Sequence, residues 1–206
     1  MRIITISREF GSGGREIGKR LADEFGFDYY DGEIIATVAE KSGLDADYVS
    51  SNLSDHGWQN VPITFRGTIG STAYIQSNKV RLLLEQKRVI EEIAALGKDF
   101  VIVGRNADVI LDQYNPFNIF VCANISAKVK RCRERAPEGE MLTDKELIHQ
   151  MKHIDKTRAK VRALMTGTTW GDRGGYQLTI NTSNWEIKEL VPIIADFAKL
   201  WFGSNT

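Results

Sequence analysis

The stretch that most constrains the fold of this chain lies near its start, where a glycine-rich turn separates two periodic segments. Residues 2–7, RIITIS, form a short run rich in β-branched residues, which indicates a buried strand. GSGGRE follows at residues 11–16, and apolar residues then recur at helical spacing over 15–26. A strand, a glycine turn and a helix in this order form the geometry of a phosphate site. The glycines let backbone N–H groups face inward, and the helix start adds partial positive charge.

This turn departs from the usual phosphate-binding pattern, G-x-x-x-x-G-K-[ST], at the two positions that carry chemistry. In that pattern the lysine neutralises phosphate charge and the hydroxyl helps to hold Mg²⁺. Here Arg15 is the nearest cation, and Glu16 stands where the hydroxyl is expected. By itself the turn is therefore compatible both with a phosphate cradle and with a tight turn that binds nothing.

Strand-like and helix-like segments alternate along the rest of the chain. Further strands are predicted at 27–31, 99–105, 118–124 and 176–181, and helices at 32–43, 77–97, 126–135, 143–164 and 185–202. Thr143 and Glu146 form a capping box at the start of one of these helices. The alternation predicts an α/β fold with a mostly parallel sheet. Ligands bind at the carboxyl ends of such strands, which directs attention to residues 7–16, 104–108 and 122–126.

The overall composition narrows the class of protein. The chain has 206 residues, is 42% hydrophobic and carries a formal net charge of zero. These values exclude a disordered chain and argue against nucleic acid or an acidic membrane as the main partner. Cys122 and Cys132 lack the spacing of a zinc or redox motif, and no apolar stretch approaches membrane-spanning length. We expect a cytoplasmic protein.

Four motifs occur in an order and spacing typical of a known family. They are GSGGREIG at 11–18, YYDGEII at 29–35, VIVGRNAD at 101–108 and IDKTRAKV at 154–161. Together they resemble the cytidylate kinase-like family, and the resemblance covers nearly the whole chain. It implies a single nucleoside monophosphate kinase-like domain over residues 1–206. The implied fold is a P-loop three-layer sandwich, with a mostly parallel five-stranded sheet flanked by helices and a helical lid. The resemblance places an acceptor-side region at about 31–76 and the lid at about 131–160.

The reaction that the resemblance implies is transfer of the γ-phosphoryl group of ATP to a nucleoside monophosphate such as CMP or dCMP, with Mg²⁺. The residues expected to bind the ATP phosphates are Gly11, Ser12, Gly13, Gly14, Arg15 and Glu16. Gly14 falls where cytidylate kinase has its phosphate lysine, and Glu16 replaces a threonine. We therefore expect Arg15 to supply the missing charge. A solvated arginine in the first helical turn is the alternative.

Residues that match the acceptor-binding positions of the family are Asp31, Arg105, Asp155 and Arg158. Arg105 directly follows a buried VIVG run at the carboxyl end of a strand, where packing does not explain an arginine. Asp31 is also compatible with a helix N-cap. Asp155 and Arg158, spaced i,i+3, are also compatible with an exposed ion pair. Thr37 stands where cytidylate kinase has an arginine for the acceptor phosphate, which weakens the case for CMP.

Arg131 and Arg135 lie at i,i+4 where the fold has lid arginines. Such residues stabilise charge on the transferring phosphoryl group, so both are candidate catalytic residues beside Arg15. A solvated basic helix face is the alternative. Val103 and Asn106 replace two aspartates of cytidylate kinase. The motifs therefore assign no metal ligand, and Asp108 is the candidate substitute.

Two other functions remain open on the sequence. The lost lysine, hydroxyl and aspartate favour a non-catalytic nucleotide-binding module. Thr37 and the unfamiliar segments 51–75 and 166–178 favour a kinase of a non-nucleotide small molecule. If Arg15 reaches the donor phosphates and a carboxylate such as Asp31 or Asp108 faces Mg²⁺, the protein is a kinase. Arg15 pointing to solvent would favour the binding module. In each case the expected partners are nucleotides or small molecules, without nucleic acid or membrane.

Overall fold

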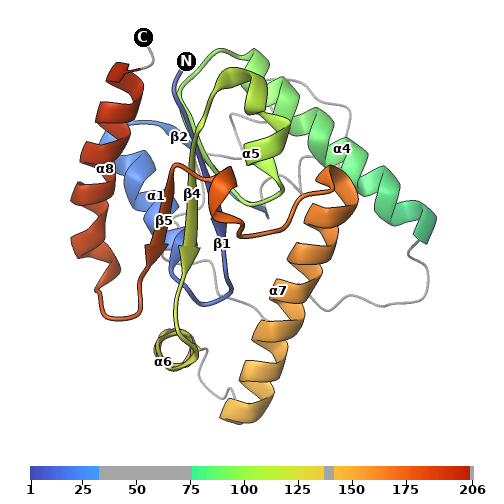
Figure 1. The fold of residues 1–206 in the computed structure, drawn as a ribbon, viewed down its shortest axis with the longest axis vertical. Coiled ribbons are helices and arrows are strands. Elements are labelled where there is room, and N and C mark those ends of the chain that lie inside the picture. The colour runs from blue at the N-terminus through green and yellow to red at the C-terminus, as the bar shows by residue number, and fades with distance from the viewer. Residues whose placement is uncertain (33–75, 137–141, 205–206) are drawn as a thin grey trace.

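The computed structural model describes residues 1–32, 76–136 and 142–204, which form a sheet with helices on both faces (Figure 1). The elements, in chain order, are β1 Ile3–Arg8, α1 Gly14–Phe25, β2 Asp28–Tyr30, α4 Gln76–Ala95, β3 Phe100–Val103, α5 Ala107–Ile110, β4 Phe117–Cys122, α6 Ile125–Glu134, α7 Asp144–Thr166, β5 Leu178–Asn181 and α8 Ile187–Ser204. Short 3-10 turns lie at Asp112–Tyr114 and Arg173–Gly175. Beyond Gly32, the helix predicted at 32–43 lies outside the described residues, as does the unfamiliar segment 51–75.

In the described part of the chain the sheet has five strands in the order β2-β3-β1-β4-β5. Each of its pairings is parallel, with Ile4 of the central strand β1 opposite Val101 of β3 and Phe117 of β4. The predicted five-stranded sheet is therefore confirmed, and it is parallel throughout. All carboxyl ends consequently meet at one edge, and the loop that follows β1 lies in the middle of that edge.

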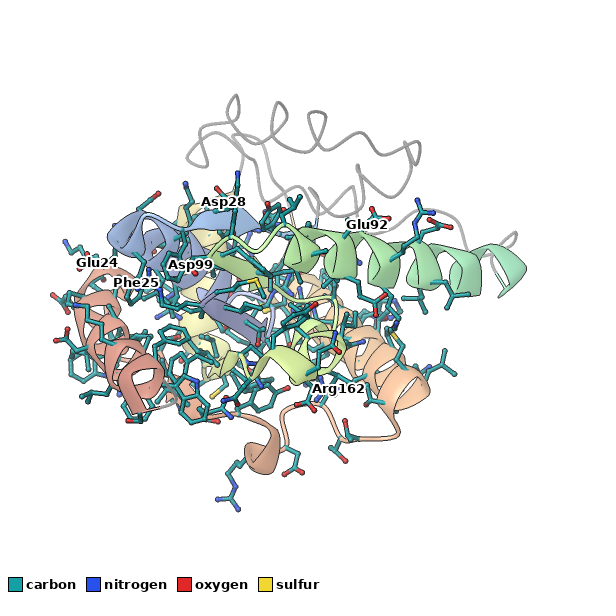
Figure 2. The ribbon with its side chains drawn as sticks, turned by 90° about the horizontal axis from the view of Figure 1, so that it is seen from above. Glu24, Phe25, Asp28, Glu92, Asp99 and Arg162 are labelled. Atoms are coloured by element: carbon teal, nitrogen blue, oxygen red, sulfur yellow. The ribbon has the colours of Figure 1, made fainter. Side chains whose placement is uncertain are left out.

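The two faces of the sheet are covered by different helices, as Figures 1 and 2 show. Side chains of a strand point alternately to opposite faces. Ile4 and Ile6 of β1 accordingly pack with α1 and α8, whereas Ile3 packs with residues of α4 and α5. The three inner strands, β1, β3 and β4, are largely apolar in sequence because both of their faces are buried.

Helices α6 and α7 pack on each other through Cys132, Leu147 and Met151. The predicted capping box at the start of α7 is confirmed. Thr143 Oγ1 accepts a hydrogen bond from the Glu146 N–H, and the Glu146 carboxylate accepts one from the Thr143 N–H at 2.8 Å. No helix among the described residues is both long and apolar enough to span a membrane.

The connection over residues 166–178 contacts the sheet through two aromatic side chains, Trp170 and Tyr176. The ring of Trp170 meets Phe120 of β4 edge-on at 5.4 Å between centroids, and Tyr176 lies 5.1 Å from the same ring. These aromatic contacts hold Trp170 against β4.

Candidate active site

The loop between β1 and α1 has the backbone of a phosphate cradle. Gly11 and Gly13 adopt positive φ angles of 75° and 88°, which glycine reaches without a steric penalty. Gly13 caps α1, so the N–H groups of the first helical turn have no acceptor within the helix. Ser12 Oγ donates to the Glu9 carbonyl at 2.8 Å, and Thr182 Oγ1 donates to the Ser12 carbonyl at 2.7 Å. Contacts on both sides therefore fix the conformation of the loop.

The packing of the loop explains why position 14 holds glycine rather than lysine. A Cβ atom at Gly14 would lie 2.5 Å from the Cβ of Arg8, and one at Gly13 would lie 2.4 Å from Ile187 Cδ1. Both distances are shorter than van der Waals contact. A side chain at position 14 therefore requires the end of β1 to move.

Four arginines gather at the carboxyl edge of the sheet, and we call them the arginine cluster: Arg8, Arg15, Arg105 and Arg158. They come from the end of β1, the first turn of α1, the turn after β3 and helix α7. Burial holds the pKa of Arg8 below its ordinary value, and the charges of Arg158, Arg15 and Arg105 lower it further. Burial also lowers the pKa of Arg158, and the positive charges of Arg105 and Arg15 lower it further. The geometry agrees, because Arg8 Nη1 lies beside Gly104, the residue before Arg105, and Arg158 Nη1 contacts the Arg8 carbonyl.

Two carboxylates meet the cluster. Arg15 Nε lies 3.4 Å from Asp31 Oδ2, and Arg158 Nη1 donates to Asp155 Oδ1 at 3.0 Å. Arg158 Nη1 also donates to the Arg8 carbonyl at 3.0 Å, which ties α7 to the end of β1. Arg15 thus points toward the end of β2 and not simply into solvent. Asp31 and Asp155 therefore each bring a negative charge to one arginine of the cluster.

Arg105 is held in an unfavourable backbone conformation. Gly104, Arg105 and Asn106 have φ angles of 82°, 61° and 54°, so three consecutive residues lie in the left-handed region. This conformation is costly for residues with a Cβ atom and concentrates at functional sites. The turn directs Arg105 toward the end of β2, where its Nη2 donates to the Gly32 carbonyl at 2.8 Å.

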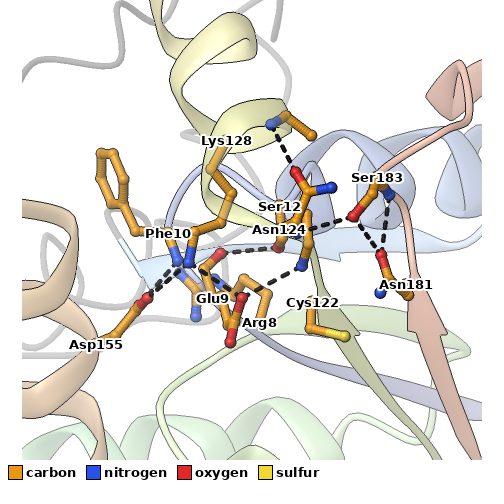
Figure 3. A network of polar contacts seen from close by, with 12 residues as sticks. Arg8, Glu9, Phe10, Ser12, Cys122, Asn124, Lys128, Asp155, Asn181 and Ser183 are labelled. Carbon is orange, nitrogen blue, oxygen red and sulfur yellow. Dashed lines mark hydrogen bonds and ion pairs between the residues drawn. The ribbon is translucent and has the colours of Figure 1, made fainter. Parts of the chain in front are cut away.

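Asp155 belongs to a polar network around the glycine loop, drawn in Figure 3. Its Oδ1 accepts a hydrogen bond from the Phe10 N–H at 2.8 Å, and its Oδ2 lies 3.6 Å from Lys128 Nζ. Lys128 Nζ also lies 3.1 Å from Glu9 Oε2. Burial raises the pKa of Asp155, although Arg158, the Phe10 N–H and Lys128 act in the opposite direction. The Asp155–Arg158 pair therefore lies against the loop and not on an exposed helix face.

Arg131 of α6 and Arg135, which follows its last residue, both contact groups near the glycine loop. Arg135 forms an ion pair with Glu16, whose other carboxylate oxygen accepts from Arg20 Nε at 2.8 Å. Arg131 Nη1 donates at 3.0 Å to Thr182 Oγ1, the hydroxyl that contacts the loop. Glu16 thus occupies the position of the usual hydroxyl and joins α1 to α6.

Asp108 forms a buried ion pair that joins α5 to α7. Its Oδ2 lies 2.5 Å from Arg162 Nη1, and both side chains are at most 5% exposed. Figure 2 labels Arg162 on α7. Across residues 1–32, 76–136 and 142–204, no three His, Cys, Asp or Glu side chains gather in a way that could hold a metal ion. Asp108 therefore serves as the buried ion-pair partner of Arg162.

Two residues at the loop escaped the sequence analysis. Arg8 ends β1 next to the loop, and Lys128 of α6 holds both Glu9 and Asp155. A usable signal existed for Arg8. It is a charged residue directly after the strand predicted at 2–7. Arg105 was selected for the same reason. Lys128 gave no such signal, because it lies on a helix with several other basic residues.

The parallel sheet and the glycine loop after its central strand define a P-loop kinase fold. The family model described as the cytidylate kinase-like family matches residues 3–184 of the chain. The protein therefore belongs to the cytidylate kinase-like family. A search of curated proteins gave no match.

Solved structures support the same fold. An uncharacterized protein from Eubacterium ventriosum is 26% identical, with a TM-score of 0.70, over 97% of this chain and 99% of its own. Shikimate kinase from Bacteroides thetaiotaomicron is 14% identical, with a TM-score of 0.54, over 96% and 98% of the two chains. A gluconokinase from Sinorhizobium meliloti is 14% identical, with a TM-score of 0.52, over 100% and 98%. The two kinases show the shared fold alone.

Replacing Arg162 by Met should lower the free energy of unfolding by about 3–5 kcal/mol, because Asp108 then stays buried without its cation. The double variant Arg162→Met/Asp108→Asn should recover much of that loss. Urea denaturation measures both. The control is Arg133→Met, which removes an exposed pair with Asp144 and should cost less than about 1 kcal/mol. Equal losses for the two arginine variants would contradict a structural role for the buried pair.

Replacing Arg105 by Gly should give a more stable protein than replacing it by Ala, by about 1–2 kcal/mol in free energy of unfolding. Both changes remove the guanidinium group, but only glycine adopts the left-handed conformation without cost. The same two substitutions at Arg20, inside α1, should rank in the opposite order by about 1 kcal/mol. If alanine is at least as stable as glycine at position 105, the backbone there is not strained.

The Asp155→Asn variant should gain stability relative to the wild type as pH rises. The pKa of Asp155 is raised above 3.8 in the folded protein, so the folded state binds its proton more tightly than the unfolded state. The contribution of Asp155 to the free energy of unfolding therefore falls as pH rises from about 3.8 through the raised pKa, a loss that the Asn variant lacks. Urea denaturation of both proteins from pH 3 to 8 tests this. A difference that moves the other way would show that Arg158 and Lys128 outweigh burial.

Proposed function

We propose that the protein is an ATP-dependent phosphotransferase that moves the γ-phosphoryl group of ATP to a nucleoside monophosphate of the CMP or dCMP type. The observation that carries the proposal is the arginine cluster, which stands directly beside a glycine loop at the carboxyl edge of a parallel sheet. Membership of the cytidylate kinase-like family supports the same reaction class.

The chemistry suits a site made of positioned charge. An oxygen of the acceptor phosphate attacks the γ-phosphorus of ATP and forms a new P–O bond. The bond to the bridging oxygen breaks, and ADP leaves with that electron pair. An ionised acceptor phosphate has no proton to give up, so the reaction needs no general base. Cations and backbone amides that offset charge in the transition state do most of the work.

The candidate residues divide between the two substrates. In this proposal Gly11, Ser12, Gly13 and Gly14 present backbone to the ATP phosphates, and Arg15 adds charge. Glu16 contributes to the phosphate site through its ion pair with Arg135. Arg131 and Arg135 on α6 belong to the lid side and offset charge on the transferring group. Asp31 and Arg105 hold the acceptor together with Asp155 and Arg158. Asp155 has a second task, since it also fixes the loop through the Phe10 N–H.

Mg²⁺ fits this site as an ion whose ligands come mostly from the nucleotide phosphates and water. Mg²⁺ in kinases keeps several waters and binds substrate phosphates with only one or two carboxylates. A site of that kind agrees with the lack of a three-ligand cluster among the described residues. Asp31, buried beside Arg15, is the carboxylate that we propose as its protein ligand. When bound, the ion would neutralise charge on the donor phosphates.

The test is ADP formation from ATP and Mg²⁺ against a panel of nucleoside monophosphates that includes CMP and dCMP. We expect acceptor-dependent turnover in the wild type and its loss in Arg105→Ala, which should still bind ATP. Arg15→Ala should weaken ATP binding about tenfold or more by calorimetry, because charged hydrogen bonds are worth about 1.5–3 kcal/mol. The control variant Arg133→Ala removes an exposed arginine of α6 and should change neither value.

Two outcomes would redirect the proposal. ATP binding without turnover on any nucleoside monophosphate would point to a binding module or to a kinase of another small acceptor. The panel should then be extended to sugars and hydroxy acids. An Arg15→Ala variant with unchanged ATP affinity would contradict the role given to the loop.

A further inference from the structure

Arg8 is the cluster member that the usual phosphate-loop pattern does not contain. It is the last residue of β1, the strand at the centre of the sheet, and it directly precedes the loop. Its backbone is held in place, because Arg158 of α7 donates to the Arg8 carbonyl at 3.0 Å. The strand and α7 together therefore fix the backbone from which the Arg8 side chain extends.

Two glycines that are far apart in the sequence make room for the Arg8 side chain. A Cβ atom at Gly14 would lie 2.5 Å from Arg8 Cβ and 3.0 Å from its Cγ. A Cβ atom at Gly104 would lie 1.8 Å from Arg8 Nη1. The stem of Arg8 thus passes the start of α1, and its guanidinium group reaches the end of β3 beside Arg105. The side chain spans the region between the glycine loop and the proposed acceptor side.

The charge of Arg8 is poorly balanced within the protein. Among the described residues its guanidinium group has neither a carboxylate partner nor a hydrogen-bond acceptor. The charged groups that act on it include three other guanidinium groups, those of Arg158, Arg15 and Arg105. A half-buried cation among like charges is costly, and a polyanion bound beside it removes that cost.

We infer that Arg8 takes over the task of the missing lysine and binds the phosphates that lie between the two substrates. Its cation comes from the end of β1 instead of the first turn of α1, and the glycine at position 14 is what leaves room for it. This inference deepens the proposed function and rests on it. The ligand chemistry is a chain of phosphates, as in ATP.

The first test is calorimetric binding of inorganic tripolyphosphate and of ATP, which needs no turnover. Arg8→Ala should lose about tenfold to hundredfold in affinity for both ligands, since one charged hydrogen-bonding group is removed. Arg8→Lys should lose less because it keeps the charge. The matched control is Arg2→Ala. Arg2 immediately precedes β1, at the end of the strand opposite Arg8, and pairs with Asp99. The Arg2→Ala variant should bind both ligands as the wild type does, and circular dichroism checks that each variant is folded.

A second test moves the cation back to its usual place. Arg8→Gly should bind tripolyphosphate weakly, and Arg8→Gly/Gly14→Lys should bind it more tightly than Arg8→Gly does. Gly14→Lys alone should not improve binding, because the new side chain meets the stem of Arg8. A purely structural role for Arg8 predicts no recovery in the double variant, so the lack of recovery would overturn the inference.

The results separate this inference from the proposed function. If Arg8→Ala binds tripolyphosphate as tightly as Arg2→Ala, the role of Arg8 is wrong and the kinase proposal stands. If Arg8→Ala loses binding but the wild type turns over no acceptor, the role of Arg8 holds and the kinase proposal fails. If the wild type binds neither tripolyphosphate nor ATP, both are wrong.

Discussion

Positive charge concentrated at one edge of the sheet is the constraint on which the rest of this site depends. Four guanidinium groups come together there from β1, α1, the turn after β3 and α7, and each disfavours the charge of the others. Other interactions in the protein hold these guanidinium groups in place. Asp31 and Asp155 meet two of them, and the left-handed turn at Arg105 fixes a third. Such a cluster supports the proposal that the site binds a polyanionic ligand.

The same constraint accounts for the altered glycine loop. Gly14 is where a phosphate lysine is expected, yet the end of β1 comes so close that a side chain there would collide with Arg8. Glu16, in place of the usual hydroxyl, is used to hold Arg135 of α6. Asp155 of α7 accepts the Phe10 N–H of the loop. In the proposed function the loop is an altered phosphate cradle, in which neighbouring cations replace its missing groups.

Much of the fold could be predicted from the sequence, because its signals are local. The buried strands are continuous apolar runs, and the capping box at Thr143 marks the start of α7. The short helix α5, Ala107–Ile110, was not predicted, since four residues carry no helical period. Arg105 was selected from its place after a strand. The environment of Arg8 was not predictable, because it depends on Gly14 and Gly104, which only the folded sheet brings together. The contact of Asp155 with the loop likewise joins residues 145 positions apart.

The central claim is that this loop binds nucleotide phosphates without a lysine. The most direct measurement is a crystal structure of the protein with a non-hydrolysable ATP analogue and Mg²⁺. We expect the phosphates to lie on the backbone of residues 11–16, with guanidinium groups of the arginine cluster in contact with the terminal phosphate. An analogue bound elsewhere, or phosphates that leave the cluster untouched while the loop stays empty, would contradict the account.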